Sequence, residues 1–509
     1  MLRQVTVKNG VIKGLPAADT RITAFKGIPY AAPPVGENRW RAPQPAADWD
    51  GVLKAYAFGP GPLQRDTGKP HLAIYKTEWN VDPEVPMSED CLTLNVWTPA
   101  NSPDEKLPVF LWFYGGGYTT GMTSEMELDG ERLARRGIVV VTANYRVNAF
   151  GFLAHPELTT ESPDAPTNFG FFDQRAANFW VRENIAAFGG DPDNITIGGQ
   201  SAGGGSVLSQ LTSPLTKGLF RRVIVASGVS QMAYQTPALR SVTLAQAEQR
   251  GVEFFKALGV KTLAEARALD ADFICDTYFK LGLFFIPPID GRFQVGLHHE
   301  LFMAGDCDVK PMLIGRTGDE FPAVPPVHTK DELRAFASDY FGADAAEFLR
   351  LIDADNGTLD EVLSRATFPS FDYTIRLFGE MKRMTGETTP MYYYVFDPEI
   401  PGDDAGTFHS CDLWFWFETL AKAWRPFVGK HYDLARKMCN YWANFIKTGD
   451  PNGKDADGSE MPHWAPYTAD APNRILLGDT VRPDDAPAGE VLSFMLEHEM
   501  KKRRAARNA

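Results

Sequence analysis

The sequence feature that most constrains the fold is a serine between a short β-branched run and a helix-like segment. Residues 195–197 (Ile-Thr-Ile) lead into residues 199–203 (Gly-Gln-Ser-Ala-Gly), and residues 206–211 follow with a helical pattern. A serine at a sharp turn from a strand into a helix takes strained backbone angles, and bulky neighbours two residues away would clash there. The helix then points its N-terminus at the group where negative charge develops. The pattern predicts a nucleophile elbow, with Ser201 as the nucleophile of a hydrolase.

The same five residues also fit a glycine-rich turn with an exposed serine, since a chain with 45 glycines contains such patterns by chance. The surrounding strands favour the elbow. Residues 109–114 and 138–143 are continuous apolar runs, as expected for central strands covered on both faces. Further strand candidates and helical segments alternate along the chain at residues 174–188, 223–226, 243–250, 311–314 and 392–396. This alternation predicts an α/β fold with an open, mostly parallel sheet.

Two other regions are expected to add to this sheet. The first forty residues alternate short apolar runs, at 5–7 and 11–14, with glycine turns, which predicts a small antiparallel sheet. Residues from about 235 to 305 and from 325 to 390 are rich in helical patterns and are expected to form cap insertions around the site. Because no low-complexity linker or internal repeat divides the chain, residues 1–509 are expected to form one elaborated domain.

Composition excludes several classes of function. Lys and Arg number 51 against 65 Asp and Glu, and the net charge of −14 argues against a nucleic-acid partner. The sequence contains no uninterrupted run of about 18 apolar residues, so no membrane span is expected. Residues 1–10 hold no apolar run of signal-peptide length. Neither a C-x-x-C nor an H-E-x-x-H pattern is present, and no metal is expected. The cysteines are odd in number and dispersed, which indicates free thiols in a reducing cytoplasm: Cys91, Cys275, Cys307, Cys411 and Cys439.

Three glycines at 115–117 directly follow the strand candidate at 109–114. Esterases carry an H-G-G-G loop at this point, and Tyr114 takes the histidine position here. Glycines let the backbone approach a substrate closely, so their N–H groups are suited to stabilise an oxyanion. We expect Gly116, Gly117 and Ala202 to provide these donors, with a flexible turn as the alternative.

A base and an acid are expected after the serine. Among nine histidines, His409 is the best placed, shortly after the strand candidate at 392–396. Asp319 and Glu320 lie side by side after the strand candidate at 311–314, where active sites form in open α/β sheets. The residues alone do not choose between these two carboxylates.

Taken together, these segments resemble the type B carboxylesterases, a family that includes bacterial para-nitrobenzyl esterases, animal carboxylesterases and cholinesterases. The resemblance covers roughly residues 5 to 480. It rests on residues 26–34, 89–96 (Glu-Asp-Cys-Leu-Thr-Leu-Asn-Val), 144–146, 173–175, 188–203, 285–291 and 442–452. It implies an α/β-hydrolase fold, with a large central twisted sheet flanked by helices.

The resemblance also assigns the acid and the base. The family places its acid at the glutamate of a G-x-x-x-D-E segment, which is Glu320 here, and its base at His409. The order Ser201, Glu320, His409 is the order of α/β-hydrolases. The implied activity is hydrolysis of small- to medium-sized carboxylic esters, with aryl and cinnamoyl esters as candidates, through an acyl-enzyme and without a cofactor. A monomer or a small homo-oligomer, acting on a small molecule, is expected.

Several further positions are best described by comparison with the family pattern. Gln200 stands where cholinesterases carry glutamate, which disfavours a quaternary-ammonium substrate. Ser410 replaces the glycine after the histidine, and the sequence offers no account of its effect. Ser227 resembles a serine that the family carries behind its triad after the next strand. The family pairs the cysteine at Cys91 with one about two dozen residues earlier, and residues 58–64 contain none.

The substrate pocket is expected to include Tyr118, Gln200, Phe285 and Trp414. For the aromatic residues other than Tyr118, burial in the core is the competing interpretation. Two other functions stay open at this point. One is a lipase-like esterase that prefers longer acyl chains, and the other is a non-catalytic binding protein like the adhesion members of the family.

Overall fold

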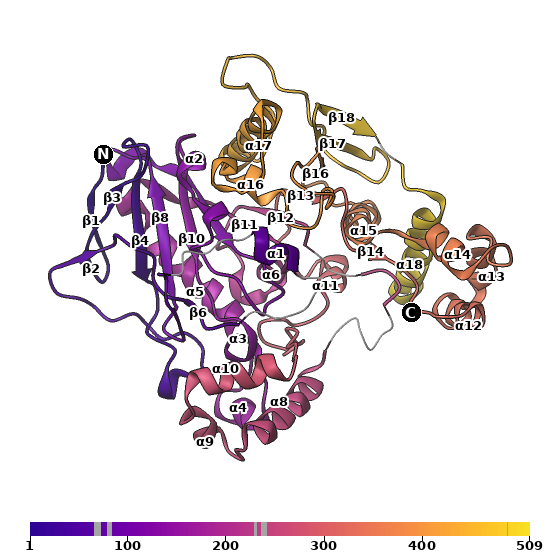
Figure 1. Ribbon diagram of the computed structural model, residues 1–509, viewed down its shortest axis with the longest axis horizontal. Coiled ribbons are helices and arrows are strands. Elements are labelled where there is room, and N and C mark those ends of the chain that lie inside the picture. Colours follow the sequence, from indigo (N-terminus) through magenta and orange to yellow (C-terminus); the bar gives the residue numbers. More distant parts are fainter. Residues whose placement is uncertain (66–72, 79–83, 229–231, 236–241, 486, 509) are drawn as a thin grey trace.

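A twisted sheet of eleven strands runs through the described part of the molecule (Figure 1). The computed structural model describes residues 1–65, 73–78, 84–228, 232–235, 242–485 and 487–508. In their order across the sheet, the strands are β18 (Val481–Asp485), β17 (Asn473–Gly478), β16 (Met391–Asp397), β13 (Met312–Thr317), β12 (Arg222–Ala226), β11 (Gly190–Gln200), β9 (Leu107–Phe113), β10 (Val139–Ala143), β8 (Thr93–Thr98), β4 (Thr23–Pro29) and β3 (Leu15–Pro16). The strands expected at residues 109–114, 138–143, 195–197, 223–226, 311–314 and 392–396 are all confirmed as members of this sheet, whereas β8, β17 and β18 were not predicted.

The middle of the sheet is parallel and its two ends are antiparallel. From β17 to β10 every neighbouring pair is parallel. The pairs β17/β18, β10/β8, β8/β4 and β4/β3 are antiparallel. Gly199 pairs with Phe113 of β9 and with Val225 of β12, so the end of β11 lies between two strands that end beside it. The parallel strands therefore bring their carboxyl ends to one edge around residue 200.

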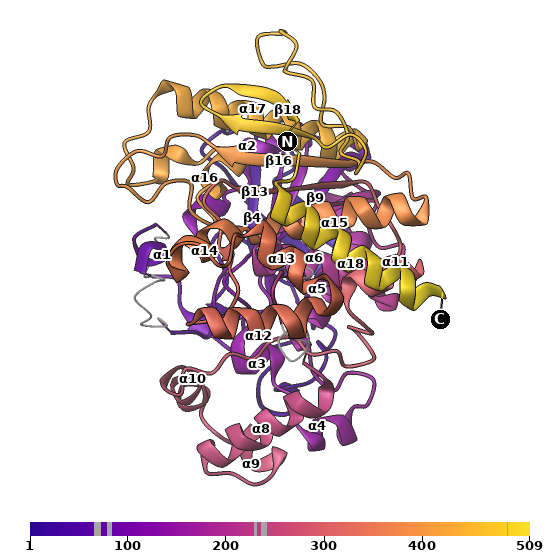
Figure 2. The same cartoon turned by 90° about the vertical axis from the view of Figure 1, so that its right-hand side faces the viewer.

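Helices cover both faces of the sheet, as Figures 1 and 2 show. One face carries α5 (Phe169–Asn184) and α6 (Ala202–Thr212), and the other carries α2 (Glu131–Ala134), α16 (Leu413–Trp416) and α17 (Gly429–Thr448). The helix expected at 174–188 begins earlier, at Phe169, because the aromatic residues of its first turn are buried. Its predicted end forms a separate 3₁₀ turn, Ile185–Phe188.

The helix-rich regions lie in two places. The helices α8 (Leu244–Leu258), α9 (Leu263–Arg267) and α10 (Ala271–Lys280) gather beside α4 (Pro156–Glu161), at the bottom of Figure 1. The helices α12 (Lys330–Phe341), α13 (Ala345–Leu351) and α14 (Leu359–Ala366) lie with the C-terminal helix α18 (Glu490–Asn508) on the right of Figure 1. Between these groups, α3 (Asn148–Phe152) contacts α10, and α11 (His298–Ala304) packs on α6. The predicted insertion at 235–305 includes residues 236–241, which lie outside the described residues.

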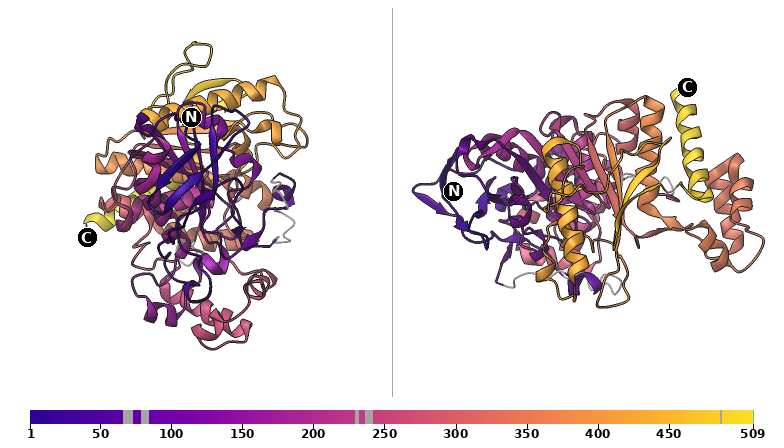
Figure 3. Two further views of the ribbon diagram at one scale, coloured as in Figure 1. Left: turned by 90° about the vertical axis from the view of Figure 1, so that its left-hand side faces the viewer. Right: turned by 90° about the horizontal axis from the view of Figure 1, so that it is seen from above.

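The small N-terminal sheet is mixed rather than purely antiparallel. Strands β1 (Gln4–Val7) and β2 (Gly10–Lys13) form the predicted antiparallel hairpin, at the N-terminal end of the molecule in Figure 3. The third strand, β5 (Val52–Lys54), pairs with β2 in parallel. The expectation missed β5 because three residues carry too little apolar pattern to identify a strand.

The core between the sheet and the helices α16 and α17 is rich in aromatic residues. Trp416 of α16 stacks on Trp442 of α17, with ring centroids 4.2 Å apart, and also contacts Trp112 of β9. These contacts hold the segment that follows residue 409 against the sheet. In the portion of the chain that the structure describes, no helix has the length and apolar character needed to cross a membrane.

Candidate active site

Ser201 occupies a sharp turn between β11 and α6. Its backbone has φ 56° and ψ −122°, a conformation that costs a non-glycine residue about 1–3 kcal/mol. Two hydrogen bonds hold the turn in place. The N–H of Ser201 donates to the carbonyl oxygen of Ala226 in β12 at 2.9 Å, and the N–H of Gly205 donates to the carbonyl of Ser201 at 2.9 Å. The predicted strand–turn–helix arrangement is therefore present at Ser201.

The two glycines of the elbow are required by close packing. A Cβ at Gly203 would lie 2.1 Å from the carbonyl oxygen of Phe113, at the end of β9. A Cβ at Gly199 would lie 2.4 Å from the carbonyl group of Gly203. Any larger residue at these positions would push α6 away from the neighbouring strand. The glycines thus place the start of α6, and Ser201 with it, directly against the loop that follows β9.

Backbone contacts bring the loops after β13 and β16 together. The N–H of Gly318 donates to the carbonyl of Phe396 at 2.8 Å, and the N–H of Asp319 donates to the carbonyl of Thr407 at 3.1 Å. Asp319 and Phe408 form an isolated parallel bridge. Asp319 directly precedes Glu320, and Phe408 directly precedes His409. The bridge therefore brings Glu320 and His409 side by side at the edge of the sheet that carries Ser201.

The side chains of Ser201, His409 and Glu320 form one chain of short contacts. His409 Nε2 lies 2.8 Å from Ser201 Oγ, and His409 Nδ1 lies 2.6 Å from Glu320 Oε2. The side chain of Glu320 has no exposed surface, and the imidazole is also largely buried. Glu320 Oε1 accepts a bond from the N–H of Thr317 at 3.3 Å. A serine hydroxyl, an imidazole and a buried carboxylate are thus aligned for proton transfer.

The charge state of Glu320 follows from these contacts. Burial by itself raises the pKa of the carboxyl, but the charge and hydrogen bond of His409 and a contribution from Ser227 lower it below its usual value. The N–H of Ser227 donates to Gly315 at 2.8 Å, which places this serine after β12 and beside β13. Its hydroxyl has no hydrogen bond of good geometry to the described residues. Glu320 is therefore ionised at neutral pH.

The neighbouring carboxylate of Asp319 faces away from the imidazole. Its Oδ2 accepts hydrogen bonds from the N–H of Thr407 at 2.8 Å and from the Thr407 hydroxyl at 3.1 Å. Asp319 therefore ties the two loops together, while Glu320 contacts His409. Tertiary contacts thus distinguish two adjacent acids that composition could not.

The glycine loop after β9 presents free donors beside Ser201. Gly116 and Gly117 have φ 102° and 62°, and a Cβ built at Gly115 would lie 3.2 Å from Ser201 Cβ. Within the described residues, the N–H groups of Gly116, Gly117 and Ala202 donate to no protein acceptor. Unpaired N–H groups next to a nucleophile are the feature that an oxyanion hole requires.

Two phenylalanine rings contact the imidazole. The rings of Phe321 and Phe371 lie with their centroids 4.7 and 5.6 Å from that of His409. They are brought there by a two-stranded pairing of β14 (Pro322–Ala323) with β15 (Phe368–Pro369). Neither ring was predicted from the sequence to lie beside His409. The position of Phe321 directly after Glu320 was an available signal, whereas Phe371 had none.

Tyr118 directly follows the three glycines and lies beside α6, the helix that begins after Ser201. A Cβ at Gly205 of α6 would lie 2.3 Å from the Tyr118 hydroxyl, and the ring packs on Phe152 and Phe171. Burial raises the pKa of the Tyr118 phenol, so it stays protonated. Gln200 is 2% exposed, and its amide nitrogen lies 3.4 Å from His409 Nε2.

The other two predicted pocket residues are buried among different neighbours. Phe285 packs on Phe254 and Tyr278 in the cluster of α8 and α10. Trp414 is 1% exposed, and its Nε1 donates to Glu78 of α1 (Ala73–Glu78) at 3.4 Å. Their contact with a substrate stays a prediction. The adjacent Phe284 is 46% exposed, and its ring lies 3.6 Å from a Cβ built at Gly117.

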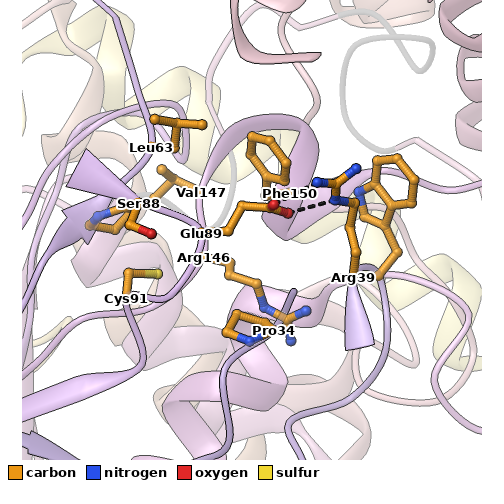
Figure 4. Close-up of a pocket in the computed structure, with 11 residues that line it drawn as sticks. Pro34, Arg39, Leu63, Ser88, Glu89, Cys91, Arg146, Val147 and Phe150 are labelled. Carbon is orange, nitrogen blue, oxygen red and sulfur yellow. Dashed lines mark hydrogen bonds and ion pairs between the residues drawn. The ribbon is translucent and has the colours of Figure 1, made fainter. Parts of the chain in front are cut away.

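Ser88, Glu89 and Cys91 are among the residues that line a separate small cavity, which Figure 4 shows. It measures about 10 Å³, enough for about one water molecule. Arg39 and Glu89 form a bidentate ion pair beside it, with both N–O distances at 2.6 Å. Cys91 borders the cavity as a free thiol whose pKa is raised by burial. The five cysteines are all free, as expected. Among the described residues, no group of three or more His, Cys, Asp or Glu is placed to hold a metal ion.

Comparison with known proteins agrees with this geometry. The Carboxylesterase family matches residues 2–347 and 371–495. Para-nitrobenzyl esterase of Bacillus subtilis (strain 168) is 33% identical, over 96% of this chain and 97% of its own. A mouse cholinesterase (Mus musculus) is 32% identical, over 90% of this chain and 81% of its own.

Solved structures give the same result. A PNB esterase is 30% identical, with a TM-score of 0.76 over 97% of this chain and 100% of its own. A carboxylesterase of Geobacillus stearothermophilus is 29% identical, with a TM-score of 0.76 over 96% of this chain and 99% of its own. These structures share the large mixed sheet flanked by helices, so the predicted α/β-hydrolase fold is confirmed. The chain therefore belongs to the carboxylesterase family and is a carboxylic ester hydrolase.

Proposed function

We propose that Ser201, His409 and Glu320 are the catalytic triad of this esterase and act through an acyl-enzyme. The observation that carries the proposal is the pair of contacts at His409, 2.8 Å from Nε2 to Ser201 Oγ and 2.6 Å from Nδ1 to Glu320 Oε2. A buried, ionised carboxylate at Nδ1 keeps the proton there and leaves the Nε2 lone pair facing the hydroxyl. This is the tautomer that a general base needs.

The mechanism has two acyl transfers. Ser201 Oγ attacks the ester carbonyl carbon while His409 Nε2 takes the hydroxyl proton, and the carbonyl oxygen becomes an oxyanion. The N–H groups of Gly116, Gly117 and Ala202 stabilise that charge. The imidazolium then gives its proton to the leaving alcohol, and the acyl group stays on Ser201. Water attacks this ester by the same route, releases the carboxylic acid and restores the serine.

The surroundings favour a neutral ester with an apolar acyl or aryl group. Phe321 and Phe284 are 45% and 46% exposed beside His409 and Gly117, and Tyr118 directly follows the glycines of the loop. Gln200 offers no negative charge that would attract a quaternary ammonium group. We therefore propose small- to medium-sized carboxylic esters as substrates, including aryl and cinnamoyl esters. The name of one relative, para-nitrobenzyl esterase, agrees with an aromatic ester.

A phosphonate probe and an ester panel test the proposal. The protein is treated with an organophosphonate ester and mapped by peptide mass spectrometry, and p-nitrophenyl esters from acetate to palmitate are then assayed. One adduct on Ser201, with faster turnover of short and medium chains, supports the proposal. Turnover of long chains alone would instead identify a lipase-like enzyme. Folded protein without adduct or turnover would overturn the triad and indicate a binding protein.

We further propose a single functional unit in which residues 235–305 and 325–390 are caps on the catalytic sheet. The described parts of these regions form the helical groups α8–α11 and α12–α14, and a cap is where an esterase encloses its ester. The five free cysteines, four of them buried, support a reducing compartment such as the cytoplasm.

A further inference from the structure

Two residues that depart from the family pattern contact each other next to the triad. Gln200 directly precedes the nucleophile and Ser410 directly follows the histidine. The Gln200 amide nitrogen donates a hydrogen bond to Ser410 Oγ at 2.7 Å, and both side chains are buried. This bond joins the end of β11 to the His409 loop, beside the contact between Ser201 and His409.

The backbone conformation of Ser410 is unusual for a serine. Ser410 has φ 78°, in the left-handed region where a side chain is unfavourable and glycine is preferred. Two backbone hydrogen bonds of 3.1 Å fix the turn. The N–H of Cys411 donates to the carbonyl oxygen of Phe408, and the N–H of Leu413 donates to the carbonyl oxygen of Ser410. A strained serine in a rigid turn indicates that its hydroxyl has a role that glycine could not fill.

The role follows from a conflict at His409 Nε2. This nitrogen must accept the Ser201 proton, yet the Gln200 amide nitrogen lies only 3.4 Å from it. An amide N–H that donated to Nε2 would compete with Ser201 and stabilise the neutral imidazole. It would also repel the N–H that Nε2 carries after proton transfer. The amide carries two hydrogens, and the shorter bond of one of them to Ser410 Oγ holds the nitrogen at this longer distance, where donation of the other to Nε2 is weak.

We infer that Ser410 is a positioning residue that accepts one hydrogen of the Gln200 amide, holds that amide back from His409 Nε2, and so keeps Nε2 available to Ser201. The inference rests on the proposed triad mechanism. Neither residue transfers a proton in this scheme, and both act through the imidazole.

The other groups around His409 stay constant when residue 410 is changed. Glu320 contacts Nδ1, and the buried carboxyl of Asp412 lies close enough for His409 to influence its pKa. The rings of Phe321 and Phe371 that pack on the imidazole are uncharged. Farther out, the charge of Glu320 acts on Tyr75 and Cys411, which are both uncharged at neutral pH, and on the cationic guanidinium of Arg316. Because Asp412 also titrates near pH 6, a change in pH profile reports the Gln200 amide where it disappears in a Gln200→Met background.

The test compares Ser410→Ala and Ser410→Gly by the pH dependence of kcat/KM with p-nitrophenyl acetate. Both variants remove the hydroxyl, but only glycine relieves the backbone. We expect each to lower the acidic limb of the profile by about 0.5 to 1 pH unit, because an amide donor stabilises the neutral imidazole. We expect kcat to fall roughly three- to tenfold with little change in KM. Gln200→Glu should shift the limb upward, because a carboxylate stabilises the imidazolium.

A double variant provides the control for coupling. Gln200→Met removes the amide with little change in size, and adding Ser410→Ala to it should have no further effect on the profile. The inference is overturned if Ser410→Gly keeps the wild-type profile, whatever its melting temperature. It is also overturned if the two substitutions remain additive in the Gln200→Met background. If Ser410→Ala does not fold, Ser410→Gly decides alone.

Failure of the inference and failure of the proposed function give different results. Wild-type protein with no phosphonate adduct at Ser201 and no turnover would contradict the triad. Wild-type protein that is labelled and active, with unshifted profiles in the Ser410 variants, would contradict only the positioning role.

Discussion

The ring of Phe371 lies nearly parallel to the imidazole of His409, with 15° between the planes and 5.6 Å between centroids. Phe371 belongs to α15 (Ser370–Thr385) and is 5% exposed, so its position is fixed by the core. Phe321 contacts the same imidazole at 4.7 Å. His409 is thus held by Glu320 at one nitrogen and by rings that restrict its rotation. An aromatic face also attracts the positive charge of the imidazolium.

Replacing Phe371 should therefore slow the chemical step. We expect Phe371→Leu to lower kcat roughly three- to tenfold, because one stabilising contact to the imidazolium is lost and the ring gains freedom. Phe378→Leu is the matched control, since Phe378 lies on the same helix, is buried, and contacts Phe302 instead. The measurement is kcat per phosphonate-titrated site. Equal kcat values for Phe371→Leu and the wild type would refute the role of the stack.

Removal of the nucleophile should abolish turnover. We expect Ser201→Ala to lower kcat by about 10⁴-fold or more, because no other group can form the acyl-enzyme. The fold should persist, since the bonds at the turn come from the backbone of residue 201. Circular dichroism and the p-nitrophenyl acetate assay measure the two effects. Wild-type-like turnover in a purified variant would show that Ser201 is not the nucleophile.

The two adjacent carboxylates should behave differently. We expect Glu320→Gln to lower kcat by about 10³- to 10⁴-fold, because an amide no longer stabilises the imidazolium or its tautomer. Asp319→Asn is the matched control. Its carboxylate bonds Thr407 rather than His409, and activity should change by only a few fold. Larger losses in Asp319→Asn than in Glu320→Gln would reverse the assignment of the acid.

The buried carboxyl of Asp412 should make stability depend on pH. Burial and the charge of Glu320 raise its pKa from 3.8 to about 6, while hydrogen bonds from Tyr394 and Trp416 partly oppose the shift. Because the folded pKa exceeds the unfolded one, the wild type loses stability as pH rises from about 4 to 6. Asp412→Asn cannot ionise and should escape this loss, which amounts to about 3 kcal/mol at most.

The measurement is the melting temperature of both proteins at pH 4.5 and 7.5. The melting temperature of Asp412→Asn, relative to that of the wild type, should rise between these two pH values and stay constant above pH 7.5. All other groups titrate in both proteins, so the difference isolates residue 412. A difference that does not change with pH would show that the folded carboxyl has an ordinary pKa.

The sequence predicted β9, β10, β12, β13 and β16 well because each contains an apolar run that is buried in the sheet. It did not predict β17, which is only partly buried, or β5, whose three residues carry no such pattern. Phe371 was missed as a neighbour of His409 for a different reason. Its approach depends on the pairing of β14 with β15, a contact between segments far apart in the chain.

The sequence by itself determined the elbow at Ser201 and the glycine loop after β9, because both are local patterns whose backbone demands are met by neighbouring residues. Through family resemblance, it also predicted the order of the proposed nucleophile, acid and base. Only the tertiary structure decided which side chains meet: that Glu320 and not Asp319 contacts His409, that Phe321 and Phe371 enclose the imidazole, and that Gln200 donates to Ser410. These contacts join loops from different strands at one edge of the sheet, and their distances depend on the packing of the whole molecule.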